Sequence, residues 1–442
     1  MEASCPAWHG VDRSQSAPLH VAPARSSLLR QPAMIAVIGM FVLLPVQAVD
    51  LPLNLAPVDL WNVVGLPLIW IYLLAGKRAL RVPYVGAMGL VLLGGLLGMM
   101  STRDATTSSI VLLKEIYLYV WFSTLATLFV AASARDLRTI LVVWCTMVLL
   151  HGSIIVGEFL SDDLWQRMAS FFGSLSKVEV IRPPGLFDNA NGAAFFQLMG
   201  FVPVLLGLRS SILAMTSAVA LVLSIIGTGS LGASSGLVAG MAVAFVAMAV
   251  AGGERRTVYK TLVWIIAIGA LLSGLYAIVL SRAPDYDDRL AYYFYSRMER
   301  SATGRFGLWQ SGLAVLFSPT SFFGVGPGNF ADPLTGKSLH NDLLVFILER
   351  GFIGALGLLT LGAIAGYKAL RMLGNSQRRA DLLVGGIFLA AMVAAAVESQ
   401  FHQVFHERAL WLVLALQEAM LVKTMAARKH SLASAETQPR TQ

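Results

Sequence analysis

Long apolar segments are the feature of this sequence that most restricts how the chain can fold. Runs of about 20 apolar residues, the length that crosses roughly 30 Å of hydrocarbon as a helix, recur along the 442 residues. Only 13% of the residues are charged, whereas a soluble domain carries roughly 25%. The alternating pattern of a membrane barrel strand is absent, and helices then remain the way to satisfy the backbone in lipid. The sequence therefore predicts an all-α, polytopic membrane protein.

About twelve membrane-spanning helices are expected in a transmembrane domain over residues 32–425, between tails at 1–31 and 426–442. The first tail is rich in Ser, Pro, Ala and Arg and is predicted to be disordered. The approximate spans are 33–49, 60–76, 83–100, 109–132, 139–160, 192–208, 211–227, 232–252, 261–281, 340–367, 382–397 and 409–424.

Basic residues set the expected orientation of these spans. When the chain is threaded from a cytoplasmic N-terminus, the short inner loops are consistently basic, as the positive-inside rule requires. Both termini are then cytoplasmic, and the protein is expected in an inner membrane. The rule also accounts for the net charge of +8, so no nucleic-acid partner is expected. The inner basic residues are Lys77, Arg78, Arg81, Arg135, Arg138, Arg209, Arg255, Arg256, Lys260, Lys368, Arg371, Arg378 and Arg379.

Two long connections face the expected periplasmic side, at about 161–191 and 282–339. Loops of that length in a compact protein are usually functional. The second contains an apolar stretch from Phe306 to Phe317, which predicts a short helix on the membrane surface. The two cysteines, Cys5 and Cys145, would lie at different depths. A disulfide is therefore not expected, and no Cys-His spacing typical of a metal site is present.

Three segments on the expected outer side combine arginine, histidine, asparagine and glycine. Residues 182–192 read Arg-Pro-Pro-Gly-Leu-Phe-Asp-Asn-Ala-Asn-Gly. The second long connection contains Arg305 and, further on, Gly-Val-Gly-Pro-Gly at residues 324–328. Residues 340–342 read His-Asn-Asp at the start of the tenth span, and 349–354 continue it as Glu-Arg-Gly-Phe-Ile-Gly.

In this order the segments resemble the O-antigen ligase and polymerase family of bacterial envelope glycosyltransferases. The family pattern has an arginine followed by Gly-x-Phe and Asn in one outer loop. A second arginine precedes a Leu-Trp pair, here Leu308-Trp309, and a Gly-x-Gly-x-Gly turn. A His-Asn pair is then followed by Glu-x-Gly-x-x-Gly. The match spans about residues 180–360, with one departure at Ser234-Ser235-Gly236, where many relatives have Ser-Arg-Gly.

The resemblance implies a transmembrane-type glycosyltransferase fold and a metal-independent reaction without a cofactor. Such enzymes transfer a glycan from a polyprenyl diphosphate to the hydroxyl of a glycan or lipid acceptor. A diphosphate leaving group needs charge stabilisation, and arginine binds phosphate oxygens in pairs. Arg182 and Arg305 are the expected catalytic arginines, and His340 is the expected general base. The expected substrate-binding residues are Asn191, Asn341, Asp342 and Gly326.

Structural interpretations of the same residues stay open. The arginines could pair with loop carboxylates, and His340-Asn341 could serve as a helix cap. The 324–328 turn could bind phosphate or, more simply, reverse the chain. Glu349 and Arg350 are expected to form a structural ion network within the tenth span. His402, His406, Glu407 and Arg408 crowd the last outer loop, as an acceptor surface or, by default, as a solvated loop.

Two choices of function remain open on the sequence. A polymerase joins the glycan to another lipid-linked glycan, and a ligase joins it to lipid A core or a protein. The first of these is favoured. A secondary transporter or lipid-glycan flippase would also have about twelve spans. Those proteins place polar residues near the bilayer midplane, often in two repeated halves, whereas here the polar segments gather on one face and no repeat is visible.

Overall fold

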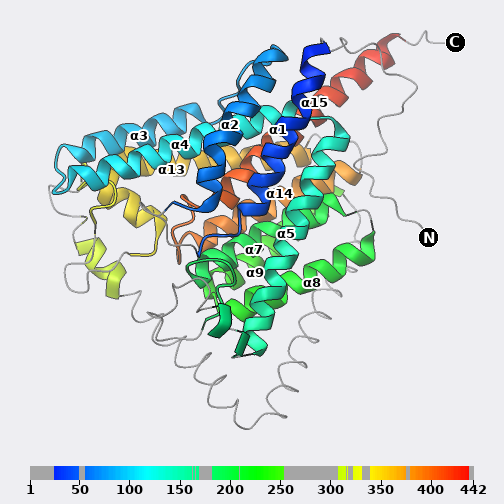
Figure 1. Cartoon of the computed structure of the whole chain (residues 1–442). Helices are drawn as coiled ribbons and strands as arrows, with labels where there is room; N and C mark the ends of the chain where they lie inside the picture. Colours follow the sequence, from blue (N-terminus) through cyan, green and yellow to red (C-terminus); the bar gives the residue numbers. More distant parts are fainter. Residues whose placement is uncertain are drawn as a thin grey trace.

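The computed structural model describes residues 24–48, 55–161, 163–164, 166–168, 182–208, 210–252, 307–314, 316, 322–330, 339–374 and 379–437. Within these ranges the chain consists of helices and connecting loops, without a strand (Figure 1). The helices are α1 (Ala24–Leu43), α2 (Pro57–Ala75), α3 (Val85–Met99), α4 (Ala105–Ala131), α5 (Ala134–Leu160), α7 (Ala190–Gly207), α8 (Ser211–Thr228), α9 (Leu231–Gly252), α13 (Asp342–Gly374), α14 (Arg379–Glu398) and α15 (Arg408–Thr437).

Eight of these helices are long and apolar enough to cross a membrane: α2, α4, α5, α7, α8, α13, α14 and α15. The apolar parts of α1, α3 and α9 are shorter. The prediction of an all-α, multi-pass membrane protein is therefore confirmed at this level, and the described residues place a helix at eleven of the expected spans. The remaining one, 261–281, lies outside the described residues, as do most of the long connection 282–339 and residues 1–23 and 438–442 of the tails.

Helix boundaries differ from the expected spans at both ends of the domain. α1 begins at Ala24, inside the segment expected as a tail, and ends at Leu43 rather than near residue 49. Pro45 follows closely, and the residue before a proline is biased away from helical backbone angles. α15 continues to Thr437, past the expected end at 424. Hydropathy marks the part of a helix that lipid covers, whereas the hydrogen-bond ladder can continue through polar residues.

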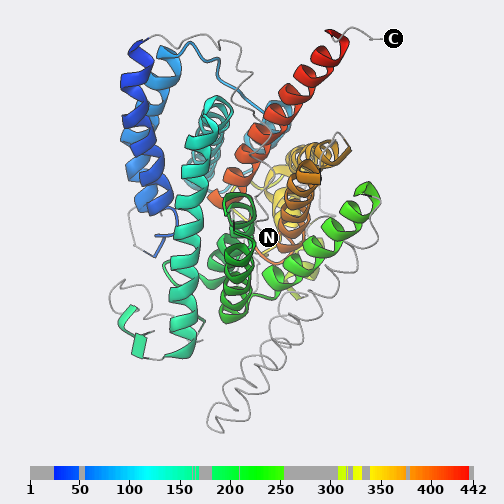
Figure 2. The same cartoon turned by 90° about the vertical axis from the view of Figure 1, so that its right-hand side faces the viewer.

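Several helix pairs organise the bundle. α1 packs on α2, α3 packs on α13, and α15 packs on α4, while α5, α7 and α8 contact one another. Figures 1 and 2 show α1 and α2 side by side at one flank of the molecule. The largest fully buried side chains are aromatic with one exception, Arg350, and they include Trp121, Trp144 and Trp411.

α9 and α14 approach closely along small residues of α9. A Cβ atom at Gly236 would lie 2.7 Å from the carbonyl oxygen of Ala394, and one at Gly240 would lie 2.5 Å from that of Ala390. Small residues allow this kind of backbone approach between membrane helices. Gly236 of the Ser234-Ser235-Gly236 segment therefore belongs to a helix–helix interface, whereas Ser235 is exposed.

Polar contacts distinguish the two ends of the bundle. At one end Arg30 of α1 pairs with Asp136 of α5, and Lys423 of α15 donates to the carbonyl of Ala132 after α4. At the other end the backbone amides of Gln47 and Ala48 donate to the carbonyl of Leu186. The second end, which we name the site end, gathers the ends of α1, α3, α5, α8 and α14 and the starts of α2, α4, α7, α9, α13 and α15.

Candidate active site

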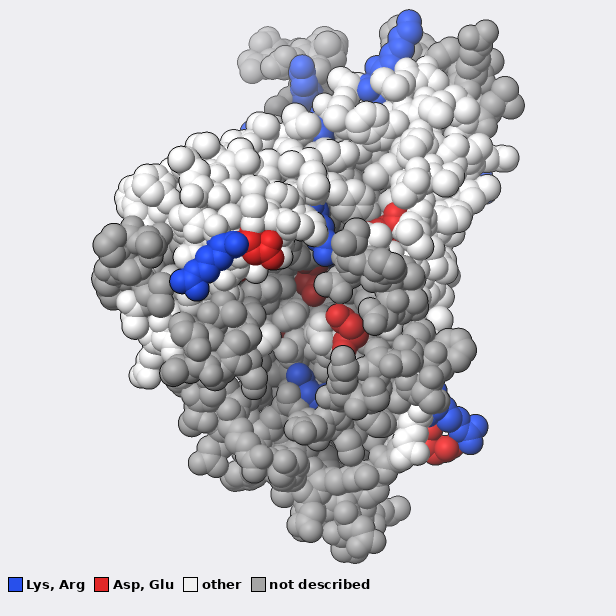
Figure 3. Space-filling view, turned by 60° about the vertical axis from the view of Figure 1, so that its left-hand side comes forward, with Lys and Arg blue, Asp and Glu red and all other residues white. Residues whose placement is uncertain are grey.

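The charged side chains of the site end surround a hollow. In Figure 3 described acidic and basic residues gather in the middle of the view, and a white surface separates them from the basic residues at the top. Three chain segments at this end carry the functional candidates: the arginine segment (182–189), the glycine turn (322–330) and the α14–α15 loop (399–407).

Arg182 lies at the entrance to α7, between two helices. Its Nε atom donates to the carbonyl of Thr228 at 2.9 Å, and an Nη2 hydrogen goes to the Asn191 side-chain oxygen at 2.9 Å. Asn189 is the N-cap of α7, because its side chain accepts the Gly192 amide at 2.7 Å. Two of the predicted site residues, Arg182 and Asn191, are thus in direct contact. Asn191 holds the guanidinium in place by this hydrogen bond.

Buried polar side chains of α5 and α7 hold the arginine segment in place. Glu158 of α5 accepts the Gly185 amide at 2.9 Å, and the His151 ring lies 3.3 Å from the carbonyl of Pro184. Gln197 of α7 donates to His151 at 2.8 Å. His151 and Gln197 have no exposed surface, and Glu158 is 2% exposed. This arrangement fixes the backbone that precedes α7 and therefore the position of Arg182.

His340, Asn341 and Asp342 open α13, as predicted. His340 has a left-handed backbone with φ of 51° and is partly buried. Asn341, rather than His340, is the helix cap, since its side chain accepts the Leu344 amide at 3.0 Å. The Asp342 carboxylate accepts the amides of Val404 and Phe405 at 2.9 and 3.1 Å. These contacts occupy the Asn341 oxygen and one carboxylate oxygen of Asp342 within the protein.

The α14–α15 loop lies between the arginine segment and the start of α13 and contacts both. Asn341 donates to the Gln400 side chain at 3.1 Å, beside the Asp342 contacts to the same loop. At the other side, the carboxylate of Glu407 would lie 3.3 Å from a Cβ atom at Gly192, on the first turn of α7. The buried side chain of Phe405 anchors the loop. Much of this loop is therefore packed rather than fully solvated, although His406 is exposed.

His402 and Glu407 form a pair within this loop. The Nε2 atom of His402 lies 3.2 Å from a carboxylate oxygen of Glu407. Burial lowers the pKa of His402, but the hydrogen bond and charge of Glu407, with Glu398 and Asp342, outweigh it, so the pKa is raised. Partial burial and the charge of Glu407 raise the pKa of the Asp188 carboxyl.

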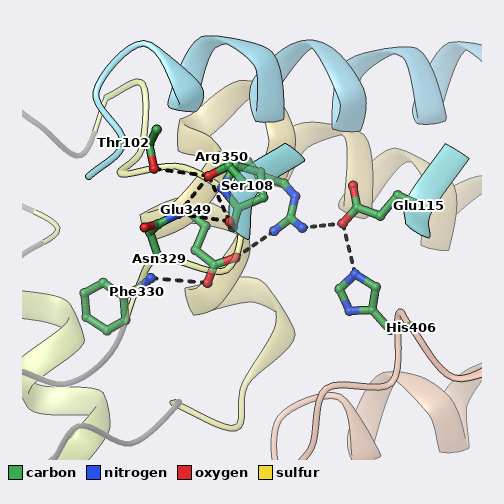
Figure 4. A network of polar contacts seen from close by, with 9 residues as sticks. Thr102, Ser108, Glu115, Asn329, Phe330, Glu349, Arg350 and His406 are labelled. Carbon is green, nitrogen blue, oxygen red and sulfur yellow. Dashed lines mark hydrogen bonds and ion pairs between the residues drawn. The ribbon is translucent and has the colours of Figure 1, made fainter. Parts of the chain in front are cut away.

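A buried ion network ties α4, α13 and the loop together (Figure 4). Arg350 pairs with Glu115 of α4 and, at 3.1 Å, with Glu349. His406 extends from the loop to Glu115, at 3.0 Å. The Arg350 and Glu115 side chains have no exposed surface. The prediction that Glu349 and Arg350 form an ion network is confirmed, and its other members come from α4 and the loop.

The glycine turn packs against a break in α13. Gly351 has φ of 64° and ψ of −171°, which interrupts the helical hydrogen bonds there. The carbonyls of Leu348 and Glu349 instead accept the amides of Val325 and Gly326, at 2.8 and 3.0 Å. The Gly326 amide, expected to bind substrate, is thus occupied within the protein. The turn reverses the chain and completes α13.

A second ion pair joins the start of α15 to α2. Arg408 donates to the buried carboxylate of Asp59, which also accepts the Tyr117 hydroxyl at 2.9 Å. Asn62 donates to the same hydroxyl at 2.6 Å. Together with His406 and Glu407, Arg408 gives the end of the loop three consecutive residues with ionic contacts.

Arg305 lies outside the described residues. Of the other predicted site residues, Arg182 and Asn191 lie on one side of the α14–α15 loop, and Asn341 and Asp342 lie on the other. No group of three His, Cys, Asp or Glu side chains in the described part of the chain has metal-site geometry. Comparison with known proteins finds neither a family model nor a curated protein that matches this chain.

The arrangement can hold an anion and move a proton. A guanidinium fixed by two acceptors is a preorganised donor for phosphate oxygens. The histidine–carboxylate pair in the loop was not selected from sequence. A signal was available, because His402, His406, Glu407 and Arg408 fall within seven residues between two apolar spans.

Proposed function

We propose that this protein is a glycosyltransferase that moves a glycan from a polyprenyl diphosphate to an acceptor hydroxyl at the site end. The observation that carries the proposal is the placement of Arg182. Its guanidinium is oriented by Asn191 and the Thr228 carbonyl, on one side of the loop that also binds Asn341 and Asp342. A fixed cation and a histidine at one end of an apolar bundle suit a lipid-linked donor, whose diphosphate lies at the membrane surface.

In the proposed reaction, Arg182 and Arg305 bind the diphosphate oxygens of the donor. The acceptor oxygen forms a bond to the anomeric carbon while the bond between that carbon and the phosphate oxygen breaks. The electron pair of the broken bond leaves with the diphosphate, where the arginines stabilise the charge. His340 takes the proton of the acceptor hydroxyl. The products are the joined glycan and a polyprenyl diphosphate, and the step as written needs neither a metal nor a cofactor.

The proposal places the protein in a bacterial inner membrane with twelve spans, both termini in the cytoplasm and the site end in the periplasm. Basic residues at the other end support this orientation. Cysteine labelling tests it: a cysteine at Arg103 should react with an impermeant maleimide in intact spheroplasts, and one at Arg135 only after lysis. The reverse pattern would put the site on the cytoplasmic face and overturn the proposal.

Among such transferases a polymerase of an exopolysaccharide or O-antigen repeat is favoured, with a ligase to lipid A core or protein as the alternative. The two differ in the product. When the purified protein acts on lipid-linked glycan alone, a polymerase makes a ladder of longer lipid-linked chains. A ligase leaves the donor unchanged until lipid A core or the protein acceptor is added.

A lipid-glycan flippase or secondary transporter is the candidate of a different class. The observation in its favour is the ion network of Glu115 and Arg350 inside membrane-spanning helices, where ionisable residues often mark transport paths. Against it, neither side chain has any exposed surface. A flippase would move lipid-linked glycan across proteoliposomes without changing it chemically.

The decisive experiment is transfer by the purified protein in nanodiscs, with polyprenyl-diphosphate glycans extracted from the host as the donor. The expected result is a longer or newly attached glycan together with released polyprenyl diphosphate. The Arg182→Lys protein provides the inactive control. Unchanged donor in the presence of every acceptor class, at protein levels that bind the donor, would overturn the proposal.

A further inference from the structure

We propose that the α14–α15 loop forms a binding subsite for the acceptor saccharide, built from His402, Glu407 and Asp188 with the rings of Phe401 and Trp309. This inference rests on the proposed function and deepens it. It assigns a ligand class to a part of the site end that the transfer step above does not use.

The polar part of the subsite holds one atom without a hydrogen-bond partner in the described part of the protein. The Nδ1 atom of His402 is buried and has no hydrogen-bond partner in the described part of the protein, while Nε2 is taken by Glu407. The side chains of His402 and Glu407 are 12% and 16% exposed, so both are nearly enclosed but still reach the surface. A buried polar atom without a partner is costly and often marks the place of a ligand or water.

The chemistry of these groups suits a sugar rather than a phosphate. A hydroxyl group donates and accepts hydrogen bonds at once, so a polyol satisfies the imidazole Nδ1 and a carboxylate together. A Cβ atom at Gly192 would lie 3.3 Å from a Glu407 carboxylate oxygen and 3.4 Å from the Asn189 amide nitrogen, which donates to Asp188. The two carboxyls therefore lie at the same turn of α7. An approaching phosphate would meet their negative charge. The subsite therefore favours a neutral saccharide.

An aromatic pair includes the residue that directly precedes His402. Trp309 and Phe401 have ring centroids 6.4 Å apart, tilted by 48°. Phe401 directly precedes His402 in the loop, and both Trp309 and Phe401 are partly exposed. A pyranose ring presents a face of C–H groups that packs on the negative face of an aromatic ring. The aromatic rings are complementary to the C–H face of a sugar, and the carboxyl and imidazole groups are complementary to its hydroxyl groups.

The position of the subsite relative to Arg182 identifies the acceptor. Glu407 lies against Gly192, and Arg182 is hydrogen-bonded to Asn191. Both side chains therefore contact the first turn of α7. The first sugar of the donor carries the diphosphate, which the carboxyls near Glu407 would repel. The reacting sugar of the acceptor carries no such charge at its hydroxyl. We therefore assign the acceptor saccharide to this side of the turn.

The test separates saccharide binding from diphosphate binding with two probes. The first is the soluble oligosaccharide released by mild acid from the host's lipid-linked glycans, and the second is undecaprenyl diphosphate without a glycan. Kd is measured for the full-length protein in nanodiscs. Glu407→Gln and His402→Phe should weaken oligosaccharide binding by about tenfold or more, as loss of a hydrogen bond to a charged group implies. Binding of undecaprenyl diphosphate should change less than about twofold.

Matched variants serve as controls. Arg182→Lys should give the opposite pattern, with weaker diphosphate binding and unchanged oligosaccharide binding. Asp163→Asn makes the same carboxylate-to-amide change at an exposed ion pair with Arg167 and should alter neither. Trp309→Ala should weaken binding of the oligosaccharide and leave binding of undecaprenyl diphosphate unchanged. Thermal unfolding of each variant establishes that it is folded.

The outcomes distinguish this inference from the proposed function. Transfer activity together with oligosaccharide binding that the loop variants do not change, or no oligosaccharide binding by the wild type, would overturn the subsite and leave the transferase proposal standing. Oligosaccharide binding that depends on His402 and Glu407, in a protein that neither binds undecaprenyl diphosphate nor transfers glycan, would support the subsite and overturn the transferase.

Discussion

The guanidinium of Arg350 and the carboxylate of Glu115 form an ion pair without solvent exposure, although the two residues are 235 positions apart. The pair joins the tenth expected span to the fourth at the site end. Arg350 also lies over the ring of Phe346, 4.2 Å from its centroid. A charge buried among apolar helices is stable only while its partner remains, so this contact fixes the relative position of α4 and α13.

Removal of one partner of this pair should strongly destabilise the protein. Among the described residues, Glu115→Ala leaves Arg350 buried with Glu349 as its one carboxylate partner. A loss of about 3–5 kcal/mol of folding free energy is typical of a broken buried pair. Thermal unfolding in detergent measures the effect. The double variant Glu115→Leu with Arg350→Met removes both charges and should recover much of the loss. A double variant no more stable than Glu115→Ala would contradict this account.

Arg182→Lys should abolish most transfer activity at matched protein levels, because lysine keeps the charge but lacks the planar fork. The hydrogen bonds to Thr228 and Asn191 cannot both be kept by one ammonium group with the same geometry. Product formation from lipid-linked donor is the measurement. Arg167→Lys is the control, since that arginine pairs with Asp163 on an exposed surface. Full activity of Arg182→Lys would reduce Arg182 to a structural residue.

His340→Asn should fold and insert normally but turn over about 100- to 10,000-fold more slowly, the range typical of a lost general base. Asparagine is the suitable replacement, because it tolerates the left-handed backbone that His340 adopts with φ of 51°. The kcat of the variant is compared with the wild type at saturating donor. Retention of wild-type kcat would refute the role of His340, and a loss confined to thermal stability would make it structural.

Asp342→Ala should loosen the α14–α15 loop. Its carboxylate accepts hydrogen bonds from two consecutive loop amides, those of Val404 and Phe405, and Ala leaves these donors without that partner. Hydrogen–deuterium exchange should become faster at residues 404–405, while the Arg30–Asp136 contact region at the other end should exchange as in the wild type. Unchanged protection at 404–405 would show that Phe405 packing alone holds the loop.

The contribution of His402 to stability should depend on pH. Its raised pKa means that the folded protein favours the protonated ring. The stabilisation is therefore fully present below the ordinary value of 6.5 and is lost as the pH rises through the higher value of the folded state. The difference in Tm between wild type and His402→Gln should shrink from about pH 6 to about pH 8.5. A difference that grows over this interval would contradict the sign.

The sequence was sufficient to predict the helices because lipid imposes one requirement that hydropathy measures directly. It was less informative at their ends. α1 starts at Ala24, nine residues before the expected 33. In this added part of the helix, Arg30 forms an ion pair with Asp136 of α5. That pairing depends on how α1 and α5 pack. Hydropathy along a single segment contains no information about such a partner.

The candidate site was predicted in part. The ion network of Arg350 was expected from the cost of charge in the membrane. Arg182 and Asn191 were each singled out, but their hydrogen bond was not predicted. The contacts of Glu115 with Arg350 and His406 were missed, since both join residues hundreds of positions apart. Asp342 shows the same difficulty, because a carboxylate that holds a loop and one that binds substrate look alike in sequence.

The interruption of α13 at Gly351 restricts evolution of the chain by length rather than by composition. Amides of the glycine turn bond to two successive carbonyls just before the break, and the Asn329 amide bonds back to the carbonyl of Gly326. A single inserted or deleted residue between 324 and 329 would shift every one of these pairings at once. Natural variants of this protein should therefore tolerate substitutions in this segment far more readily than insertions or deletions.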